Sequence, residues 1–440
     1  MFLVRTVFWV GLRCGGHLFA NQSIRLGLSG PRFRGSNGLS QENEPPVRND
    51  ALPELDDLSR EVYGVLGIPI DAVDLPGVVQ RIGAALSRDA PYLISTPNLN
   101  FLVSSQVDPE FRESLLRRDL CPVDGVPIVW ISRLLGAPIR ERVAGSDIFD
   151  RLKLQKDPPA KVFLFGGPEG VADTASRVLN AQSNGVVCVG ALYPGYCPIE
   201  EMSTDVIIDA INSSGARFLV ASLGAQKGQS WLLHNHDRLK IPVRSHLGAA
   251  INFQAGLLKR APLFVRKFGL EWLWRIKEEP YLWSRYLADG GVLLSLMLTS
   301  VLPLVLAATW RRVRGTTSDF QILANDHENA CRITVAGMAT ASNVASAVPV
   351  FRDAITKSGE LTIDVSALRV IDARFFGLLL MVRKRLIERG GRLHFAGVSR
   401  RVERAFRLNR FNFLLRSREA SREATATNWG LGEATTRLRG

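Results

Sequence analysis

The sequence predicts an α/β fold in which a mostly parallel, Rossmann-like sheet domain is followed by a smaller α/β domain. Short apolar runs such as KVFLFGG and ARFLVASLG read as buried strands that end at glycine, and amphipathic windows such as VADTASRVLNAQ separate them. A second set of strand-like runs, RITVAG, LTIDVSAL and RLHFAGV, follows an uncharged stretch. The chain has 440 residues, which is too long for one ordinary domain and suits two.

Composition divides the chain into successive segments. The first segment is expected to be poorly ordered. Its short apolar start is interrupted by Arg5, and the segment lacks the features of a secretory signal. A short membrane-surface anchor is an alternative for the same residues, and the final polar segment is expected to fray. In order, the segments are a leader at 1–59, the parallel-sheet domain at 60–289, a hydrophobic segment with a basic flank at 290–315, the second domain at 316–416 and a polar tail at 417–440.

The hydrophobic segment centres on Val292–Trp310, which carries no charge and is just long enough to span a bilayer. Pro303 is expected to kink it, and Arg311, Arg312 and Arg314 follow at once. A single span, a re-entrant or interfacial helix, and a buried helix all fit this pattern. Because both flanking domains are expected to be cytoplasmic, we favour insertion without crossing, at the cytoplasmic face of the inner membrane.

The chain is basic, with a formal net charge of +13 and a pI near 9.9, so anionic partners are expected. The arginines are scattered and no nucleic-acid-binding motif is present, so we expect no nucleic acid partner.

The 5 cysteines include no CxxC pair, and their odd count argues against a disulfide framework. His234 and His236 face apart on a presumed helix, and no metal site or cofactor is predicted.

A series of motifs in the first domain carries a family resemblance over about half of the chain, from Val65 to Asp289. The motifs are LGIPID (Leu66–Asp71), STPNLNFL (Ser95–Leu102), VDGVPIVW (Val123–Trp130), ERVAGSD (Glu141–Asp147), FLFGG (Phe163–Gly167), YPGY (Tyr193–Tyr196), NFQAGLLKRAP (Asn252–Pro262) and GLEWLWRIKEEP (Gly269–Pro280). In this order and spacing they resemble the WecG/TagA/CpsF glycosyltransferases. Members of that family transfer a sugar from UDP to a polyprenyl-pyrophosphate-linked acceptor, with inversion and without a metal. The resemblance therefore implies a UDP-sugar donor and a lipid-linked acceptor.

Such a transfer needs a base for the acceptor hydroxyl and a way to stabilise the leaving diphosphate. Many enzymes use an Asp-x-Asp pair and a metal for the second task, but the sequence has no such pair, so arginines and backbone amides are expected instead. Asp124 lies where the family's general base is proposed, and Thr96 is expected to position the substrates beside it. A carboxylate before Gly and Pro can also be a plain Asx turn, which is the structural alternative for Asp124.

The remaining candidate residues are expected to bind substrates. Gly166 and Gly167 end a strand before a helix, where free amides can approach a diphosphate, although most such turns are only turns. The basic and aromatic stretch Lys259–Arg285 suits an anionic membrane face and a lipid-linked pyrophosphate, or alternatively a surface helix. The candidates are Asn98, Asn100, Arg142, Gly166, Gly167, Gly224, Gln226, Lys227, Gln229, Asn252, Arg266, Arg275 and Arg285.

Two segments depart from the family pattern. Where the family commonly reads Gly-x-Pro-Lys-Gln-Glu, this chain has Gly224–Gln229, with Gln229 in place of the acid. Asn252 stands where an aspartate is common. Both segments are expected to touch the UDP portion, and neutral side chains there can hydrogen-bond but cannot act as acids or bases. The departures leave the sugar undetermined.

The second domain, through LTIDVSALRVIDARFFGLLLMVRKRL, resembles STAS domains such as the sporulation anti-sigma-factor antagonists. Those domains carry a phosphorylated serine after an aspartate, but here Asp372 is followed by Ala373, so that switch is expected to be absent. Ser366 is expected only to cap a turn. We expect this domain to bind an unknown protein partner, and its removal from Phe320 onward to leave transfer largely intact.

Two functions therefore compete. The first is a glycosyltransferase of exopolysaccharide or cell-surface polysaccharide biosynthesis with a regulatory STAS-like domain. The second is a catalytically degenerate scaffold that binds a nucleotide sugar and signals through the STAS-like domain.

Overall fold

The computed structural model describes residues 56–155, 158–182, 185–248, 250–259, 261–262, 264–265, 269–315, 319–327 and 330–415. The polar tail, Arg266 and most of the expected leader lie outside these residues. The sequence places the end of the leader at residue 59, but Asp57–Ser59 is a short 3₁₀ helix in which Asp57 and Leu58 are buried. The first domain therefore begins before residue 60.

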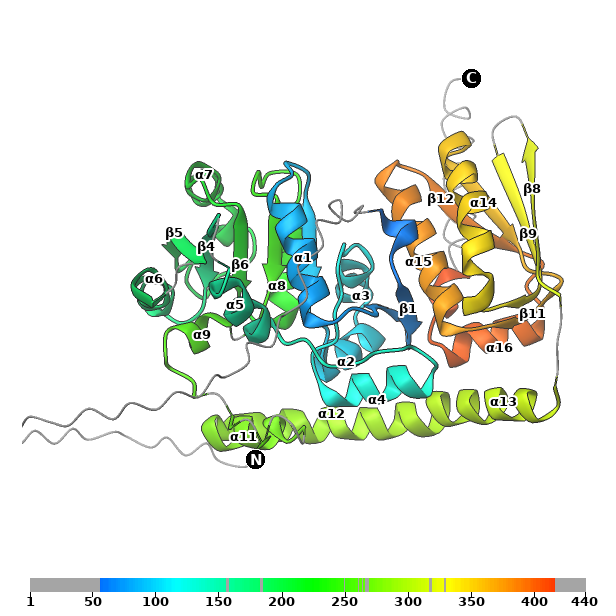
Figure 1. Ribbon diagram of the computed structural model, residues 1–440, viewed down its shortest axis with the longest axis horizontal. Coiled ribbons are helices and arrows are strands. Elements are labelled where there is room, and N and C mark those ends of the chain that lie inside the picture. The colour runs from blue at the N-terminus through cyan, green and yellow to red at the C-terminus, as the bar shows by residue number, and fades with distance from the viewer. Residues whose placement is uncertain are drawn as a thin grey trace, which may run out of the picture. The chain divides into compact units, whose positions relative to one another are not determined.

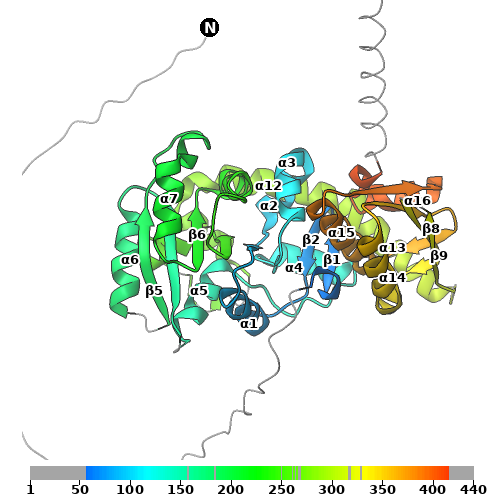
Figure 2. The same ribbon diagram turned by 90° about the horizontal axis from the view of Figure 1, so that it is seen from above.

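Among the described residues, the first domain has a wholly parallel five-stranded sheet of order β3-β7-β6-β4-β5 (Figures 1 and 2). Its strands are β3 (Tyr92–Ser95), β4 (Ala160–Gly166), β5 (Val186–Leu192), β6 (Phe218–Ser222) and β7 (Val243–His246). Alternate side chains of β4 enter different cores, because successive residues of a strand face opposite sides: Val162 and Leu164 in one, Phe163 and Phe165 in the other. The predicted parallel α/β domain is confirmed.

Helices cover both faces of this sheet. Side chains of α1, α5, α6 and α9 pack with Val162 and Leu164, whereas those of α7 and α8 pack with Phe163 and Phe165. Asp74, Asn98 and Asp108 begin α1, α2 and α3 as N-caps. The helices are α1 (Leu75–Leu86), α2 (Leu99–Val107), α3 (Pro109–Leu116), α4 (Val126–Leu134), α5 (Gly145–Lys153), α6 (Val171–Gln182), α7 (Asp205–Ser213), α8 (Ala225–His234) and α9 (Ala250–Gln254).

A separate antiparallel hairpin precedes the sheet. It consists of β1 (Val62–Val65) and β2 (Ile68–Asp71), and every residue of both strands is buried. Its turn places Leu66 at φ +46° and Gly67 at φ +94°, as a tight two-residue hairpin requires. Such burial on all sides means that the hairpin is covered by other parts of the chain.

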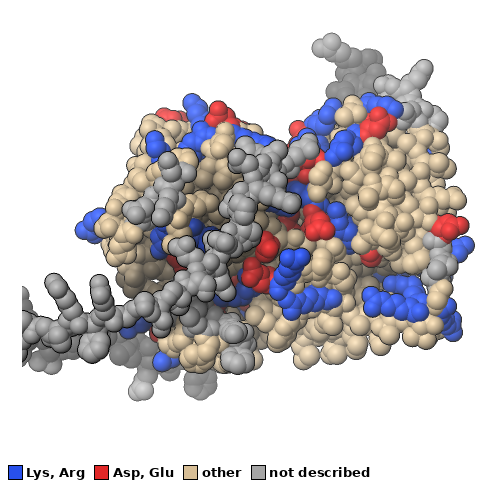
Figure 3. All heavy atoms as spheres, in the orientation of Figure 1, with Lys and Arg blue, Asp and Glu red and all other residues tan. Residues whose placement is uncertain are grey.

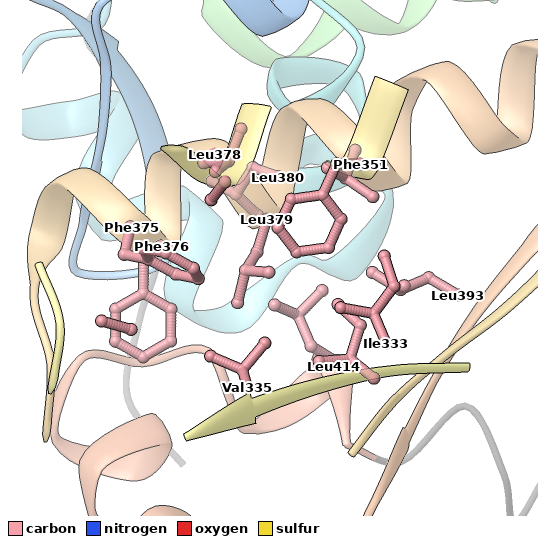
Figure 4. Packing of buried hydrophobic residues seen from close by; sticks show 14 of the residues in the cluster. Ile333, Val335, Phe351, Phe375, Phe376, Leu378, Leu379, Leu380, Leu393 and Leu414 are labelled. Atoms are coloured by element: carbon pink, nitrogen blue, oxygen red, sulfur yellow. The ribbon is translucent and has the colours of Figure 1, made fainter. Parts of the chain in front are cut away.

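The second domain is smaller and also α/β. In the described chain its sheet runs β11-β9-β10-β12 with parallel neighbours, and β8 pairs with β9 in antiparallel fashion. Figure 4 shows its core, where Phe351, Phe375 and Leu379 face Ile333 and Val335. The elements are β8 (Gln321–His327), β9 (Ala330–Ala339), α14 (Val344–Lys357), β10 (Glu360–Asp364), β11 (Leu368–Ile371), α15 (Ala373–Glu388), β12 (Arg392–Ala396) and α16 (Arg400–Leu408).

A long helical stretch joins the two domains. It comprises α11 (Glu271–Glu278), a 3₁₀ turn at Pro280–Leu282, α12 (Trp283–Leu296), a π-helical turn at Met297–Val301 and α13 (Leu302–Val313). The π-helical turn lies just before Pro303, whose missing N–H interrupts the regular hydrogen bonding of the helix. Of the helices in the described residues, Pro280–Val313 alone is long and apolar enough to cross a membrane.

Candidate active site

The carboxyl ends of β3, β4, β6 and β7 meet at one edge of the sheet, because parallel strands point the same way. Glycine turns follow three of them, with φ of +82° at Gly167, +81° at Gly224 and +57° at Gly248. Hydrogen bonds connect these turns: the Gly167 N–H donates to Ser222 O at 2.7 Å, and Ser222 Oγ donates to Gly248 O at 2.6 Å. The edge is therefore a set of linked turns whose glycines leave the backbone accessible.

Asp124 lies beside the turn that follows β3. Its N–H donates to Pro97 O at 2.9 Å, and Gly125, with φ +125°, begins α4 directly after it. A Cβ atom on Gly125 would lie 3.7 Å from Cβ of Asn98, so the Asp124 turn and the Thr96–Asn98 turn are neighbours. The structure thus brings the two residues expected to be catalytic, Asp124 and Thr96, into adjoining loops.

The charges around Asp124 are incompletely paired. Arg142 Nη1 lies 3.7 Å from Asp124 Oδ1 but only 2.7 Å from Glu271 Oε2. Burial raises the pKa of Asp124 to about 7; Arg142 counteracts this rise, and the carboxylates of Glu271 and Asp147 add to it. The Asp124 side chain is still 26% exposed. A carboxyl group with these properties can exchange a proton with a ligand near neutral pH.

The asparagines after β3 make structural contacts. Asn98 Oδ1 accepts a hydrogen bond from the Phe101 N–H at 3.2 Å and so caps α2. Asn100 lies on α2 rather than in a loop, and its Nδ2 is 3.5 Å from Asp289 Oδ2 on α12. Thr96 is almost fully buried. Asn100 therefore ties the helix after β3 to the long joining helix.

Gly166, Gly167 and Asn252 come together at the end of β4. A Cβ on Gly166 would meet Ser222 O at 2.7 Å, and one on Gly167 would lie 3.8 Å from Asn252 Oδ1. Asn252 Oδ1 is buried without a hydrogen-bond partner among the described residues. A free acceptor beside a glycine turn at the carboxyl edge of the sheet is suited to a polar ligand group.

Comparison with known proteins identifies both domains. The profile of the WecG/TagA/CpsF glycosyl transferase family matches residues 63–304, more than half of the chain. The chain belongs to this family. The STAS profile described as "Mlab, STAS domain" matches residues 322–416, so the second domain is a STAS domain. The family match extends to residue 304, past the domain end expected at 289, and therefore includes α12.

Two relatives carry the same printed name, N-acetylglucosaminyldiphosphoundecaprenol N-acetyl-beta-D-mannosaminyltransferase. The one from Bacillus spizizenii is 29% identical over 206 residues, which covers 46% of this chain and 77% of the relative. The one from Staphylococcus aureus is 23% identical over 214 residues, which covers 48% of this chain and 82% of the relative. Both alignments are shorter than half of this chain.

The family departures at 224–229 take different places in the structure. Gln229 is fully buried, and its Nε2 donates to Ser95 Oγ at 2.9 Å beneath the sheet edge. Its side chain is therefore packed inside the first domain, and its expected contact with UDP stays a prediction. Gln226 pairs with Asp108, and Lys227 Nζ donates to Cys197 O at 2.8 Å. Of the two departures, only Asn252 remains beside the glycine turns.

The expected arginines are divided between the site and the joining helix. Arg275 pairs with Glu279 at 2.6 Å. Its positive charge opposes the rise in the pKa of Asp124, although burial has the larger effect. Arg285 lies on α12 over the Tyr286 ring at 5.3 Å. Arg266 is outside the described residues. Arg275 is thus the arginine of this basic stretch that acts on the candidate base.

Glu271 was not singled out by sequence reasoning, although it lies in the quoted motif GLEWLWRIKEEP. A signal was available, because it is the first of three glutamates in this motif and lies beside Trp272. Within the described residues, one carboxylate cluster has metal-like spacing, formed by Asp57, Asp119 and Glu388. Lys384 Nζ lies 2.6, 2.6 and 2.9 Å from these three groups, so an ammonium group already occupies its centre.

Proposed function

We propose that this chain is an inverting, metal-independent glycosyltransferase that moves a sugar from a UDP-sugar to a polyprenyl-pyrophosphate-linked glycan precursor. The product would enter an exopolysaccharide or another cell-surface polysaccharide. The observation that carries the proposal is the setting of Asp124, whose pKa near 7 and incomplete pairing with Arg142 suit a general base. Family membership supplies the reaction class.

In the proposed step, the acceptor hydroxyl oxygen attacks the anomeric carbon of the donor sugar. Its proton passes to Asp124 as the new glycosidic bond forms, and the bond from that carbon to the UDP oxygen breaks. The electron pair leaves with UDP, whose diphosphate gains negative charge. One displacement from the opposite face inverts the anomeric centre, so one base is sufficient.

The leaving diphosphate needs positive partners. α8 begins after Gly224, at the carboxyl edge of the sheet, and no side chain caps its first N–H groups. These N–H groups are therefore available to a ligand at that edge. Gly167 and Asn252 lie at the same edge, and Arg142 lies beside Asp124. These groups support a metal-independent cradle, in which amides and a guanidinium stabilise the departing UDP.

The names of the relatives support a lipid-linked diphosphate acceptor. An apolar face on this chain is suited to reaching such a lipid. Leu294, Leu298, Leu302 and Leu306 recur at every fourth residue along α12 and α13 and are all exposed. Figure 3 shows few charged side chains along the lower edge, where Figure 1 shows these helices, and Lys and Arg lie just above it. We infer that this face lies on the cytoplasmic surface of the inner membrane.

Contacts of the joining helix favour an interfacial position over a span. Leu296 and Val301 pack into the core of the first domain. Arg410 of the STAS domain donates to Ser300 Oγ at 3.1 Å and to Thr299 Oγ1 at 3.2 Å. A helix that holds both domains along its length cannot place them on opposite sides of a bilayer.

A vesicle test addresses this face. Replacing Leu298 and Leu302 by Asp should weaken binding of the full chain to anionic vesicles by about tenfold or more, since each exposed Leu contributes on the order of 1.5–3 kcal/mol when buried. Val206, which is 80% exposed on α7, provides the matched control, and Val206→Asp should bind as the wild type does. Equal binding of all three proteins would place the membrane contact elsewhere.

The enzymatic test is UDP release with a panel of UDP-sugars and a polyprenyl-pyrophosphate-linked acceptor. Asp124→Asn keeps the size of the side chain but cannot take the proton, so kcat should fall about a hundredfold or more with donor KM nearly unchanged. A chelator should leave wild-type turnover unaltered. Near-normal turnover of Asp124→Asn would reduce Asp124 to a turn residue. Donor binding without any turnover by the wild type would favour the scaffold function instead.

A further inference from the structure

Helix α15 of the STAS domain is buried between its own sheet and the first domain. A Cβ atom on Gly377 would lie 1.9 Å from Val62 O of β1, so only glycine allows the helix to approach this strand. A Cβ on Gly64 of β1 would in turn lie 2.7 Å from Phe376 Cβ. The backbones of the two domains therefore meet without intervening side chains, which is typical of a permanent contact.

Basic side chains of α15 reach into the first domain. Lys384 Nζ lies 2.6 Å from both Asp57 Oδ2 and Asp119 Oδ1. Arg383 binds both carboxylate oxygens of Glu113, at 3.1 and 2.9 Å. Arg374 donates to the backbone oxygens of Val62 and Arg60 at 3.0 and 3.1 Å. These three cations of the STAS helix thus have partners in the other domain.

Lys384 is the most enclosed of these cations. Its side chain is 2% exposed, and burial alone would favour the neutral amine. The carboxylates of Asp119 and Asp57 outweigh burial and hold the pKa of Lys384 above its ordinary value. Burial likewise opposes ionisation of Asp57, but Lys384 and Arg60 hold its pKa below the usual range. The pair is fully charged at neutral pH, and loss of Lys384 would leave the buried Asp57 with Arg60 as its remaining cation.

The Lys384 contact continues along the chain to the candidate base. Asp119 Oδ2 accepts a hydrogen bond from the Leu93 N–H of β3 at 2.7 Å, and Leu120 forms a parallel bridge with Ile94. The Cys121 N–H donates to Asp71 Oδ2 at 2.6 Å. Residues 119–124 therefore run beside β3 and end at Asp124, with Lys384 holding the first of them.

We propose that Lys384 is a positioning residue: through Asp119 it fixes the segment 119–124 and so holds Asp124 in place for transfer. The STAS domain is then a structural part of the transferase site, and a ligand or partner that moves α15 would change turnover. The catalytic part of this inference rests on the proposed function. The structural part, fixation of the segment, does not.

The test uses the full-length chain with Lys384→Met and, as matched control, Arg385→Met. Arg385 lies next to Lys384 on α15 but is 47% exposed and pairs with Glu388 of the same helix. Lys384→Met should accelerate hydrogen exchange of the amides in 119–124, lower kcat about tenfold or more and leave donor KM within about twofold. Lys384→Arg should recover much of the loss, and Arg385→Met should match the wild type in every measurement.

Unchanged exchange in 119–124 together with unchanged kcat in Lys384→Met would overturn the proposal. If this variant fails to fold, Lys384→Met combined with Asp119→Asn takes its place, because it removes the cation together with one of its two acids and leaves Asp57 paired with Arg60. The double variant should fold yet keep fast exchange and low kcat, and wild-type values for both would equally overturn the proposal. If the wild type transfers no sugar, the proposed function fails, while the exchange measurement still decides whether Lys384 fixes the segment.

Discussion

Two clusters of charge lie at opposite ends of residues 119–124, and they are built in opposite ways. At the first end, Lys384 Nζ lies 2.6 Å from both Asp119 and Asp57, so each buried acid has a close cation. At the other end, Arg142 is 3.7 Å from Asp124 because its closer partner, at 2.7 Å, is Glu271. Acidic and basic side chains thus form a fully paired, or closed, network at the first end and an incompletely paired, or open, cluster at the other.

The difference explains why one cluster holds structure and the other is suited to chemistry. Lys384 and Arg60 outweigh burial and lower the pKa of Asp57, so that acid stays ionised at any pH near neutrality. Burial dominates at Asp124 and raises its pKa to about 7. A carboxylate that is fully paired with cations stays ionised near neutral pH, whereas an incompletely paired carboxylate can exchange a proton there.

The largest effect is expected from removing the closed network. A chain that ends at Gly315 would remove Lys384 from Asp57 and Asp119, leave Arg60 as the remaining cation of Asp57, and expose β1. Breaking a buried pair costs about 3–5 kcal/mol, a large part of the roughly 5–15 kcal/mol that stabilises a typical domain. We therefore expect the truncated chain to lose its cooperative thermal transition in calorimetry, in contrast to the independence that the sequence indicates. A truncated chain that melts cooperatively near the full-length temperature would show that the domains are separable.

Removing the negative charge of Asp124 from the open cluster should instead raise the stability of the fold. The pKa of Asp124 is about 7 in the fold against an ordinary value of 3.8, so ionised Asp124 destabilises the fold above about pH 7, and the effect vanishes below about pH 4. Asp124→Asn should therefore melt at a higher temperature than the wild type at about pH 8, while turnover falls. Thermal melts at several pH values measure this. A lower melting temperature at about pH 8 would mean that the carboxylate is well paired.

Smaller effects on donor KM and stability are expected at Asn252 and Gln229, the two positions where an acid is common in the family. Asn252→Ala should raise donor KM severalfold, because the Asn252 amide lies beside the Gly167 turn. Gln229→Ala should leave donor KM within about twofold and lower stability by about 1–3 kcal/mol, because a buried hydrogen bond to Ser95 is lost. Donor titration and melting of both variants distinguish these outcomes. A KM effect of Gln229→Ala without a loss of stability would return Gln229 to the donor site.

The sequence was sufficient for the sheet and for most of the glycine turns, because apolar runs that end at glycine have a local physical cause. The burial of Gln229 was not anticipated although a signal existed: it lies three residues before the buried Leu232, on the inward side of α8. The assignment of Asp124 as base came from the family resemblance, because an Asp-Gly turn alone is equally well a plain turn.

The interdomain network could not have been predicted from the sequence. In FFGLLLMVRKRLIERG, Arg383 and Lys384 read as the solvent-facing side of an amphipathic helix. Their partners Glu113, Asp57 and Asp119 are more than 260 residues away along the chain. Ala373, where related STAS domains carry a serine, is buried in a core cluster of the first domain. Along α15 the STAS domain is covered by the first domain, and its expected protein partner stays a prediction.

The pH dependence of kcat tests the central claim most directly, that Asp124 is an incompletely paired base. Turnover should be lost as the pH falls through about 7, because the base must be deprotonated. In Glu271→Gln the midpoint should move to lower pH, since a nearby negative charge is gone and Arg142 is free to approach Asp124. A kcat that is flat through neutrality, or a midpoint that Glu271→Gln leaves in place, would contradict the account.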